Sequence, residues 1–284
     1  MRVDFLAGTL GPVPVIRSAP TILVFDSGLG GLTVFAELVR ARPDARFVYA
    51  ADDAAFPYGR LGEQALVARV LGVMERLIAR HRPDLAVIAC NTASTLVLPH
   101  LRRRFDIPFV GTVPAIKPAA ALSRSRMIAV LATPGTVARD YTRGLIEAYA
   151  GGCRVALVGS RRLAGFAEAE LEGVPAADAD IRDEIAPCFV EEGGARTDAV
   201  VLACTHYPLL LARLRDLAPW PVAWIDPAPA IARRVVELLG PAATAEPEES
   251  LAIFTGGAGL RAPLRRALAA RGFAAVEVDS IPLG

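Results

Sequence analysis

The sequence is nearly devoid of lysine: Lys117 is the only one, and every other side chain in the basic set is an arginine. An enzyme that uses pyridoxal phosphate needs a lysine for its Schiff base, so that cofactor could attach here at one position only. An excess of charge of one sign is also missing, since 31 basic residues face 30 acidic ones and both kinds are spread along the chain. We therefore expect no nucleic-acid partner, and we interpret the short run 102–104 (RRR) as a solvated helix end.

Long hydrophobic runs are absent as well, although 53% of the residues are apolar. No segment offers the roughly 18 uncharged apolar residues that a membrane-spanning helix needs. Residues 1–20 include Asp4, Gly8 and Pro12 and lack the continuous apolar stretch of a signal peptide, so we interpret them as an N-terminal extension. The four cysteines are dispersed rather than spaced like a disulfide framework. These features predict a cytoplasmic protein with reduced thiols and no contact with a membrane.

What the sequence does contain is an alternation of short apolar runs with amphipathic helical patterns. The runs are apolar throughout, which is typical of strands buried on both faces of a parallel sheet. Strands are predicted at 21–25, 46–50, 85–89, 108–111, 126–131, 154–158, 198–203 and 222–225, with a final pair at 251–254 and 274–278. Helices are predicted at 62–81, 94–104, 136–149, 176–192, 207–217 and 228–239. The pattern predicts a doubly wound α/β fold.

Two pairs of segments hint at a duplication. LAVIAC at 85–90 resembles AVVLAC at 199–204, and ILVFDSGLGGLTV at 22–34 has a weaker echo in IAVLATPGTVARD at 128–140. Two similar α/β units would place these strand ends around one crevice, which is where open α/β sheets bind ligands. The segment 240–250 is poor in large apolar residues and is interpreted as a surface loop.

Two motifs follow the first two predicted strands. The stretch 26–31 (DSGLGG) opens a helix, and its glycines allow a tight turn with N–H groups free for an anion. It is not a dinucleotide-binding fingerprint, because Thr33 stands where the third glycine should be. The stretch 52–59 (DDAAFPYG) places acids and a Pro-Tyr-Gly turn beyond a strand, where functional loops are common.

Two further motifs carry thiols: Cys90-Asn91-Thr92 and Cys204-Thr205-His206-Tyr207-Pro208. Each cysteine is predicted at a strand end and a helix start, where the helix dipole lowers the pKa of a thiol. Either one alone is more often a small core residue than a functional one. Their equivalent positions in the repeat favour a functional pair, whereas Cys153 and Cys188 have no such setting and are taken as structural.

Three kinds of chemistry fit the cysteine motifs. Cys90, Cys204 and His206 could be three metal ligands, but they lack the spacing typical of metal sites. Cys204 could be an acyl-transfer nucleophile with His206 as its base, which leaves Cys90 unexplained. Proton transfer uses both thiols, because inverting a stereocentre needs a base on one face of the carbon and an acid on the other.

Taken in order, the motifs resemble those of the bacterial glutamate racemases, within the aspartate/glutamate racemase superfamily. The matching stretches are VFDSGLGGLTV (24–34), YAADDAAFPYG (49–59), VIACNTAS (87–94), IPFVGTV (107–113) and LACTHYPLL (202–210). They run over residues 21–226, so they cover most of the chain.

The resemblance implies two similar, doubly wound α/β domains with mostly parallel sheets, related by pseudo-symmetry, with the active site in the cleft between them. The first domain would comprise 21–115 plus 222–284, and the second 116–221. The implied activity is the interconversion of L- and D-glutamate without pyridoxal phosphate, metal or nucleotide, supplying D-glutamate for peptidoglycan synthesis and cell shape. Family members commonly form dimers, so a homodimer is an open expectation.

The resemblance also implies roles for single residues. Cys90 and Cys204 would be the two bases, assisted by Asp26 and His206 respectively. Glu168, in the phrase LAGFAE, is the best match to the family's glutamate near the second cysteine, and Glu170 is the alternative. The residues implied in binding the carboxylates and ammonium of glutamate are Asp26, Ser27, Tyr58, Gly59, Asn91, Thr92, Thr205 and His206.

This chain departs from the family pattern at one place, since Asp53-Ala54-Ala55 stands where Thr-Ala-Arg is frequent. Any role of that arginine is therefore missing or supplied elsewhere. The sequence leaves open a racemase for aspartate or a related small amino acid, because one methylene changes binding by only about 1–3 kcal/mol. It also leaves open a non-catalytic amino-acid-binding protein and a thiol hydrolase.

Overall fold

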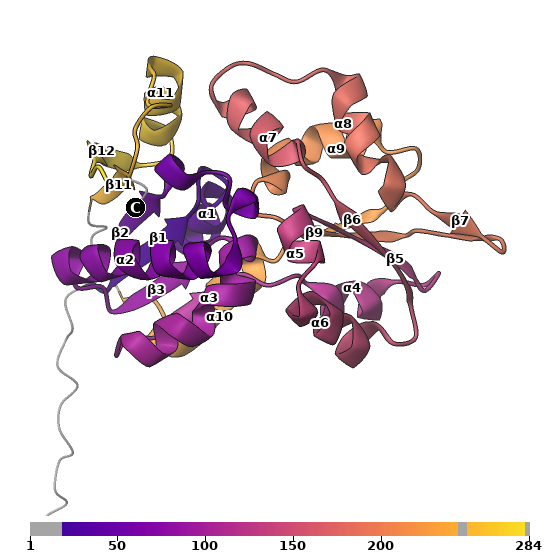
Figure 1. The fold of residues 1–284 in the computed structure, drawn as a ribbon, viewed down its shortest axis with the longest axis horizontal. Helices are drawn as coiled ribbons and strands as arrows, with labels where there is room; N and C mark the ends of the chain where they lie inside the picture. Colours follow the sequence, from indigo (N-terminus) through magenta and orange to yellow (C-terminus); the bar gives the residue numbers. More distant parts are fainter. Residues whose placement is uncertain (1–18, 244–248, 282–284) are drawn as a thin grey trace, which may run out of the picture.

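The computed structural model describes residues 19–243 and 249–281. Most of the predicted N-terminal extension and the middle of the predicted 240–250 loop lie outside the described residues. The described chain forms two units side by side, each built on its own parallel sheet (Figure 1). The predicted α/β fold with two mostly parallel sheets is confirmed.

The first unit contains a six-stranded sheet in the order β12-β11-β2-β1-β3-β4, with every pair parallel. Its strands are β1 (Thr21–Asp26), β2 (Arg46–Ala51), β3 (Leu85–Ile88), β4 (Phe109–Gly111), β11 (Ser250–Phe254) and β12 (Phe273–Val278). Helices α1 (Leu32–Ala41), α10 (Ala228–Leu239) and α11 (Ala262–Ala269) pack on one face. Helices α2 (Glu63–His81) and α3 (Asn91–Arg104) pack on the other.

The second unit contains a four-stranded sheet in the order β10-β9-β5-β6, again all parallel. Its strands are β5 (Met127–Ala132), β6 (Arg154–Gly159), β9 (Ala199–Ala203) and β10 (Ala223–Ile225). Helices α4 (Ile116–Leu122) and α6 (Asp140–Ala150) cover one face, and α7 (Leu163–Leu171), α8 (Asp178–Ile185) and α9 (Leu211–Leu217) cover the other. A small hairpin, β7 (Glu191–Glu192) and β8 (Ala195–Arg196), completes the unit.

The two sheets share one topology. Strands β4-β3-β1-β2 of the first sheet and β10-β9-β5-β6 of the second have the same spatial order and the same order along the chain. The central strands β1, β3, β5 and β9 are buried along nearly their whole length, as continuous apolar runs require. The echoes seen in the sequence therefore correspond to equivalent strands, β1 with β5 and β3 with β9.

Three predicted helices are divided or shortened in the structure, and the helix predicted at 94–104 begins earlier, at Asn91. The helix predicted at 176–192 ends at Ile185, because Pro187 cannot donate a hydrogen bond inside a helix, and a 3₁₀ turn (Ala186–Cys188) follows. The helix predicted at 136–149 is two helices, α5 (Pro134–Val137) and α6. The helix predicted at 207–217 begins with a 3₁₀ turn, Tyr207–Leu210, before α9.

The division of the chain into 21–115 plus 222–284 and 116–221 stays a prediction. The strand pairing bears on its second boundary, because β10 pairs with β9 and so lies in the second sheet. We propose that the chain returns to the first unit after Ile225 rather than before it.

Candidate active site

Both motif cysteines line one small cavity between the two units. Cys90 lies two residues after the end of β3 and Cys204 directly after β9, so equivalent strand ends bring the two thiols to the same place. The cavity has a volume of about 20 Å³ and both thiols are buried. It is lined by Ser27, Phe56, Pro57, Tyr58, Gly59, Cys90, Asn91, Thr92, Thr133, Ala164, Cys204, Thr205 and His206.

Cys90 lies among groups from the loop after β1. Its Sγ is 3.6 Å from the Ser27 Oγ, within hydrogen-bonding distance for sulfur. The neighbouring Asp26 is fully buried; its Oδ2 accepts the Gly31 N–H at 2.7 Å, and its Oδ1 has no hydrogen-bond partner among the described residues. Burial raises the pKa of Asp26, opposed by the charge of His206 and by the Gly31 N–H. Asp26 is therefore suited to exchange a proton close to Cys90.

Cys204 has a different partner, His206. The Nδ1 of His206 lies 3.7 Å from the Cys204 Sγ, and its Nε2 lies 2.9 Å from Oε1 of Glu168. Burial alone would lower the pKa of His206, but the contacts with Cys204 and Glu168 outweigh it and raise that pKa well above its usual value. The imidazole is thus held as a cation that donates one N–H to the thiol sulfur and the other to the carboxylate.

The glycines of the first motif allow the second unit to approach closely. A Cβ at Gly30 would lie 2.4 Å from Nδ1 of His206, and a Cβ at Gly28 would lie 2.1 Å from Oε1 of Glu168. The same Glu168 oxygen accepts the Leu29 N–H at 2.8 Å. The loop therefore binds an anion through its backbone, as its composition predicts, and that anion is a side chain of the other unit.

Hydroxyl and amide groups form the rest of the polar wall. Thr92 Oγ1 lies 3.0 Å from Thr133 Oγ1 and 3.4 Å from Thr136 Oγ1, which joins the two units across the cavity. Asn91 is buried, and neither its Oδ1 nor its Nδ2 has a partner among the described residues. Since an unpaired buried amide costs free energy, this side chain is a strong candidate for ligand binding.

Tyr58 differs from the interpretation made from the sequence. It lines the cavity beside Gly59, but its hydroxyl donates to Oδ2 of Asp52 at 2.6 Å. Its phenol oxygen is therefore engaged by a residue behind the cavity wall. Between the two candidate glutamates, Glu168 contacts His206, whereas Glu170 pairs with Arg213.

Four residues of the cavity were not among the predicted site residues: Phe56, Pro57, Thr133 and Ala164. Thr133 follows β5 and caps α5 by accepting the Thr136 N–H. It lies in the echo of the first motif, so the repeat itself was the signal for a second polar loop at the site. Phe56 lies in the 52–59 motif and packs on His206 with ring centroids 5.4 Å apart, but an aromatic side chain offers no acid–base chemistry that would have singled it out within that motif.

The prediction that a helix start lowers the pKa of both thiols is wrong for Cys90 and lacks its basis at Cys204. Cys90 does precede helix α3, but its burial and the charge of Asp26 raise the pKa of the thiol well above its ordinary value. Cys204 is followed by a 3₁₀ turn, and α9 begins only at Leu211. At Cys90, burial and the charge of Asp26 therefore outweigh the Ala93 N–H of the helix start, which by itself lowers the pKa of the thiol.

No group of three or more His, Cys, Asp or Glu side chains is arranged to hold a metal ion within residues 19–243 and 249–281. In the same described part of the chain, no helix has both the length and the apolar character needed to span a membrane. All four cysteines are free thiols.

Two parallel sheets that present a thiol each to one polar cavity define an α/β protein with a ligand site between duplicated units. Comparison with known proteins agrees with this description. The family model described as Asp/Glu/Hydantoin racemase matches residues 26–235. The chain belongs to this family of racemases, as the motif resemblance predicted.

Several relatives are similar over most of their length. The glutamate racemase of Brucella ovis is 56% identical over 254 residues, which span 88% of this chain and 91% of that protein. The glutamate racemase of Mesorhizobium japonicum is 58% identical over 239 residues, or 83% of this chain and 91% of that protein. The crystal structure of Escherichia coli glutamate racemase with L-glutamate and the activator UDP-MurNAc-Ala superposes with a TM-score of 0.85 at 40% identity, covering 92% and 98% of the two chains.

Proposed function

We propose that the chain interconverts L- and D-glutamate by passing a proton between Cys90, Cys204 and the substrate Cα. The single observation that carries this proposal is the presence of both thiols in one cavity, each with its own buried acid–base neighbour. A binding protein has no need of two such thiols, and a thiol hydrolase has no need of the second. Glutamate is proposed as the substrate because the similar relatives are named glutamate racemase.

The reaction begins with one cysteine as a thiolate and the other as a thiol. The thiolate removes the Cα proton, and the electron pair of the C–H bond remains on the substrate as a carbanion. The opposite thiol then donates its proton to the other face of Cα, which leaves it as the thiolate. The stereocentre is inverted with no net change in composition, and the reverse reaction uses the same two groups in exchanged roles.

The environments of the thiols favour one resting arrangement. The pKa of His206 is raised well above its usual value, and its Nδ1 lies 3.7 Å from the Cys204 sulfur, so this imidazole can exchange a proton with that thiol. Burial and Asp26 raise the pKa of Cys90, which favours its neutral form. We infer that Cys204 is the base in the resting enzyme, that Cys90 is the acid, and that Asp26 and His206 relay protons on their own sides.

The polar wall is suited to the three charged groups of glutamate. The unpaired amide of Asn91 and the hydroxyls of Ser27, Thr92 and Thr205 offer hydrogen bonds to two carboxylates and an ammonium group. A cavity of about 20 Å³ has room for about one water molecule, so we propose that the two units part to admit the substrate.

Incubation with L-glutamate in D₂O tests the activity. The expected result is a decay of the circular dichroism signal with incorporation of solvent deuterium at Cα, seen by proton NMR. Aspartate, treated in parallel, should react far more slowly. Binding of glutamate without either change would contradict the proposal.

The same assay tests the absence of a cofactor. Activity is expected to survive exhaustive dialysis against EDTA with no pyridoxal phosphate added. An activity that required pyridoxal phosphate would instead direct attention to Lys117 and contradict the two-thiol reaction.

We further propose a cellular role and place for the enzyme. A source of D-glutamate would serve peptidoglycan synthesis and hence cell shape, and the reduced thiols on which the reaction depends suit the cytoplasm. Rescue of a D-glutamate-requiring bacterium by the chain tests the role. Analytical ultracentrifugation of the full chain, with and without glutamate, tests the expected homodimer.

A further inference from the structure

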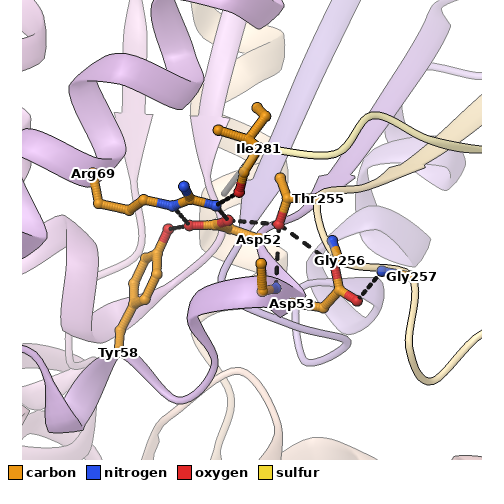
Figure 2. Close-up of polar contacts among 9 residues, drawn as sticks. Asp52, Asp53, Tyr58, Arg69, Thr255, Gly256, Gly257 and Ile281 are labelled. Carbon is orange, nitrogen blue, oxygen red and sulfur yellow. Dashed lines mark hydrogen bonds and ion pairs between the residues drawn. The ribbon is translucent and has the colours of Figure 1, made fainter. Parts of the chain in front are cut away.

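A buried polar network lies directly behind the Tyr58–Gly59 wall of the cavity. Its centre is Asp52, which follows β2 and is fully buried. Figure 2 shows Tyr58, Arg69 and Thr255 converging on this carboxylate. Tyr58 donates to Oδ2 at 2.6 Å and Thr255, about 200 residues away in the sequence, donates to Oδ1 at 2.6 Å, so the two residues share one acceptor.

Arg69 supplies the charge of this network. It extends from α2, and its Nε donates to Asp52 Oδ2 at 2.9 Å while a terminal nitrogen donates to Oδ1 at 2.5 Å. The same nitrogen donates to the Ile281 carbonyl at 2.8 Å. Only 9% of the Arg69 side chain is exposed. A buried, bidentate arginine–carboxylate pair is strongly oriented, and removing one partner leaves an uncompensated charge.

Asp53 extends the network to the loop after β11. Its two oxygens accept the N–H groups of Gly256 and Gly257, each at 2.7 Å (Figure 2). Gly257 has a φ of +71°, a conformation that favours glycine. Asp52 and Asp53 therefore join the carboxyl end of β2 to the carboxyl end of β11. Asp53 is also the first residue of the stretch 53–55, where Thr-Ala-Arg is frequent in the family.

We propose that Arg69 is a positioning residue for the substrate pocket, acting through Asp52 on Tyr58 and Gly59. Arg69 does not line the cavity itself, and Tyr58 contacts both the cavity and Asp52. The fixed carboxylate holds the phenol oxygen, and the phenol ring in turn fixes the 3₁₀ turn Tyr58–Arg60, which contains Gly59. This inference rests on the proposed racemase function and adds a determinant of substrate binding to it.

The loss of Arg69 should therefore affect substrate binding more than the proton-transfer step. Without its cation, the Asp52 carboxylate must move, take up a proton or draw in water, and each response changes the acceptor of Tyr58. A displacement of about 1 Å in a positioning group can cost about 100-fold in kcat/KM. We expect Arg69→Ala to raise KM for both enantiomers about tenfold or more, with a smaller change in kcat.

Arg76 offers a matched control. It lies two turns further along α2 and pairs with Asp279 of the C-terminal segment, its Nε donating to Oδ2 at 2.9 Å. Arg76→Ala thus loosens the same helix from the same segment without touching Asp52. We expect its KM to stay within about twofold of the wild type.

Rescue by added guanidinium ion distinguishes a positioning role of Arg69 from a general loosening of helix α2. The ion should restore a low KM to Arg69→Ala, because it can pair with the Asp52 carboxylate, and it should leave the wild type and Arg76→Ala unchanged. The combination of Arg69→Ala with Asp52→Asn should also raise KM by less than the product of the two single effects.

Four outcomes decide the inference. An unchanged KM in Arg69→Ala, or equal losses in Arg69→Ala and Arg76→Ala, would overturn it. If Arg69→Ala does not fold, Tyr58→Phe removes only the hydroxyl that reaches Asp52, and an unchanged KM in that variant would overturn it too. Wild-type racemisation is measured first, because an inactive wild type would contradict the proposed function and the inference with it.

Discussion

His206 and Glu168 form the contact that assembles the site from its two halves. The imidazole Nε2 lies 2.9 Å from Glu168 Oε1, and that oxygen also accepts the Leu29 N–H of the first unit at 2.8 Å. One carboxylate therefore orients the imidazole beside Cys204 and attaches it to the loop that carries Asp26. The charge on His206 and the closed arrangement of the units depend on the same side chain.

Glu168→Gln should keep this geometry and remove the charge. The glutamine oxygen can accept both hydrogen bonds, but it no longer stabilises an imidazolium. Because the contacts with Glu168 and Cys204 raise the pKa of His206, the variant should lower that pKa toward its usual value of about 6.5. The chain has three histidines, so proton NMR can follow each ring through a pH titration, with His206→Asn to assign the signal.

The raised pKa of His206 sets the direction in which stability and activity depend on pH. The protonated form of His206 stabilises the fold below the unfolded pKa of about 6.5, and this contribution is lost as pH rises through the folded pKa. In Glu168→Gln the alkaline limb of kcat/KM should move to lower pH. A His206 signal that titrates identically in both proteins would contradict the assignment.

Gly30→Ala should abolish most of the activity because its Cβ would lie 2.4 Å from His206 Nδ1. The two units must then separate or the imidazole must turn away, and we expect kcat/KM to fall by about 100-fold. Gly72→Ala is the control, since a Cβ there meets no atom within 4 Å and the position is inside α2. It should leave kcat/KM unchanged and stabilise the fold by about 0.5–1 kcal/mol.

Asn91→Leu should stabilise the protein and weaken substrate binding. The amide of Asn91 is buried without a hydrogen-bond partner among the described residues, which costs about 1–3 kcal/mol, so an apolar replacement of similar size relieves it. Urea unfolding should show a higher free energy, while KM for glutamate rises. A destabilised variant with unchanged KM would show that this amide does not serve the substrate.

Asp198→Asn should destabilise the fold without involving the site. Burial would raise the pKa of Asp198, but hydrogen bonds from Ser123, Ser125 and the Arg124 N–H outweigh it and lower that pKa. The resulting stability is present above the unfolded pKa of about 3.9 and is lost as pH falls through the folded pKa. Urea unfolding at pH 7 should show a loss of about 1–3 kcal/mol with racemisation unchanged.

The sequence predicted the parts of the site that follow from strand order. Cys90 and Cys204 each follow an equivalent apolar strand, and the carboxyl ends of parallel strands lie at one edge of a sheet. The sequence could therefore predict that the two thiols lie in one site. Thr133 was present in the echo of the first motif but carried no chemistry of its own there. The strand predicted at 222–225 was assigned to the first unit, but it pairs with β9 in the second sheet. That pairing is a tertiary contact, so no local sequence signal could have indicated it.

The remaining features depend on side chains brought together from distant elements. The pKa of Cys90 is set by burial and by Asp26, neither of which a helix-start argument includes. The hydroxyl of Tyr58 points to Asp52 because Arg69 and Thr255 hold that carboxylate, and these residues lie on α2 and after β11. The end of α8 before Pro187 follows from local chemistry, although the helix predicted at 176–192 ran through it, whereas α3 accommodates Pro99 in its interior.

Racemisation by single-cysteine variants tests the central claim most directly. Cys90→Ser and Cys204→Ser are each incubated with L- and with D-glutamate in D₂O, with Cys188→Ser as a control that removes a buried thiol outside the cavity. The two-thiol account predicts that both active-site variants lose interconversion in both directions while the control retains it. Wild-type rates in either active-site variant would contradict the account.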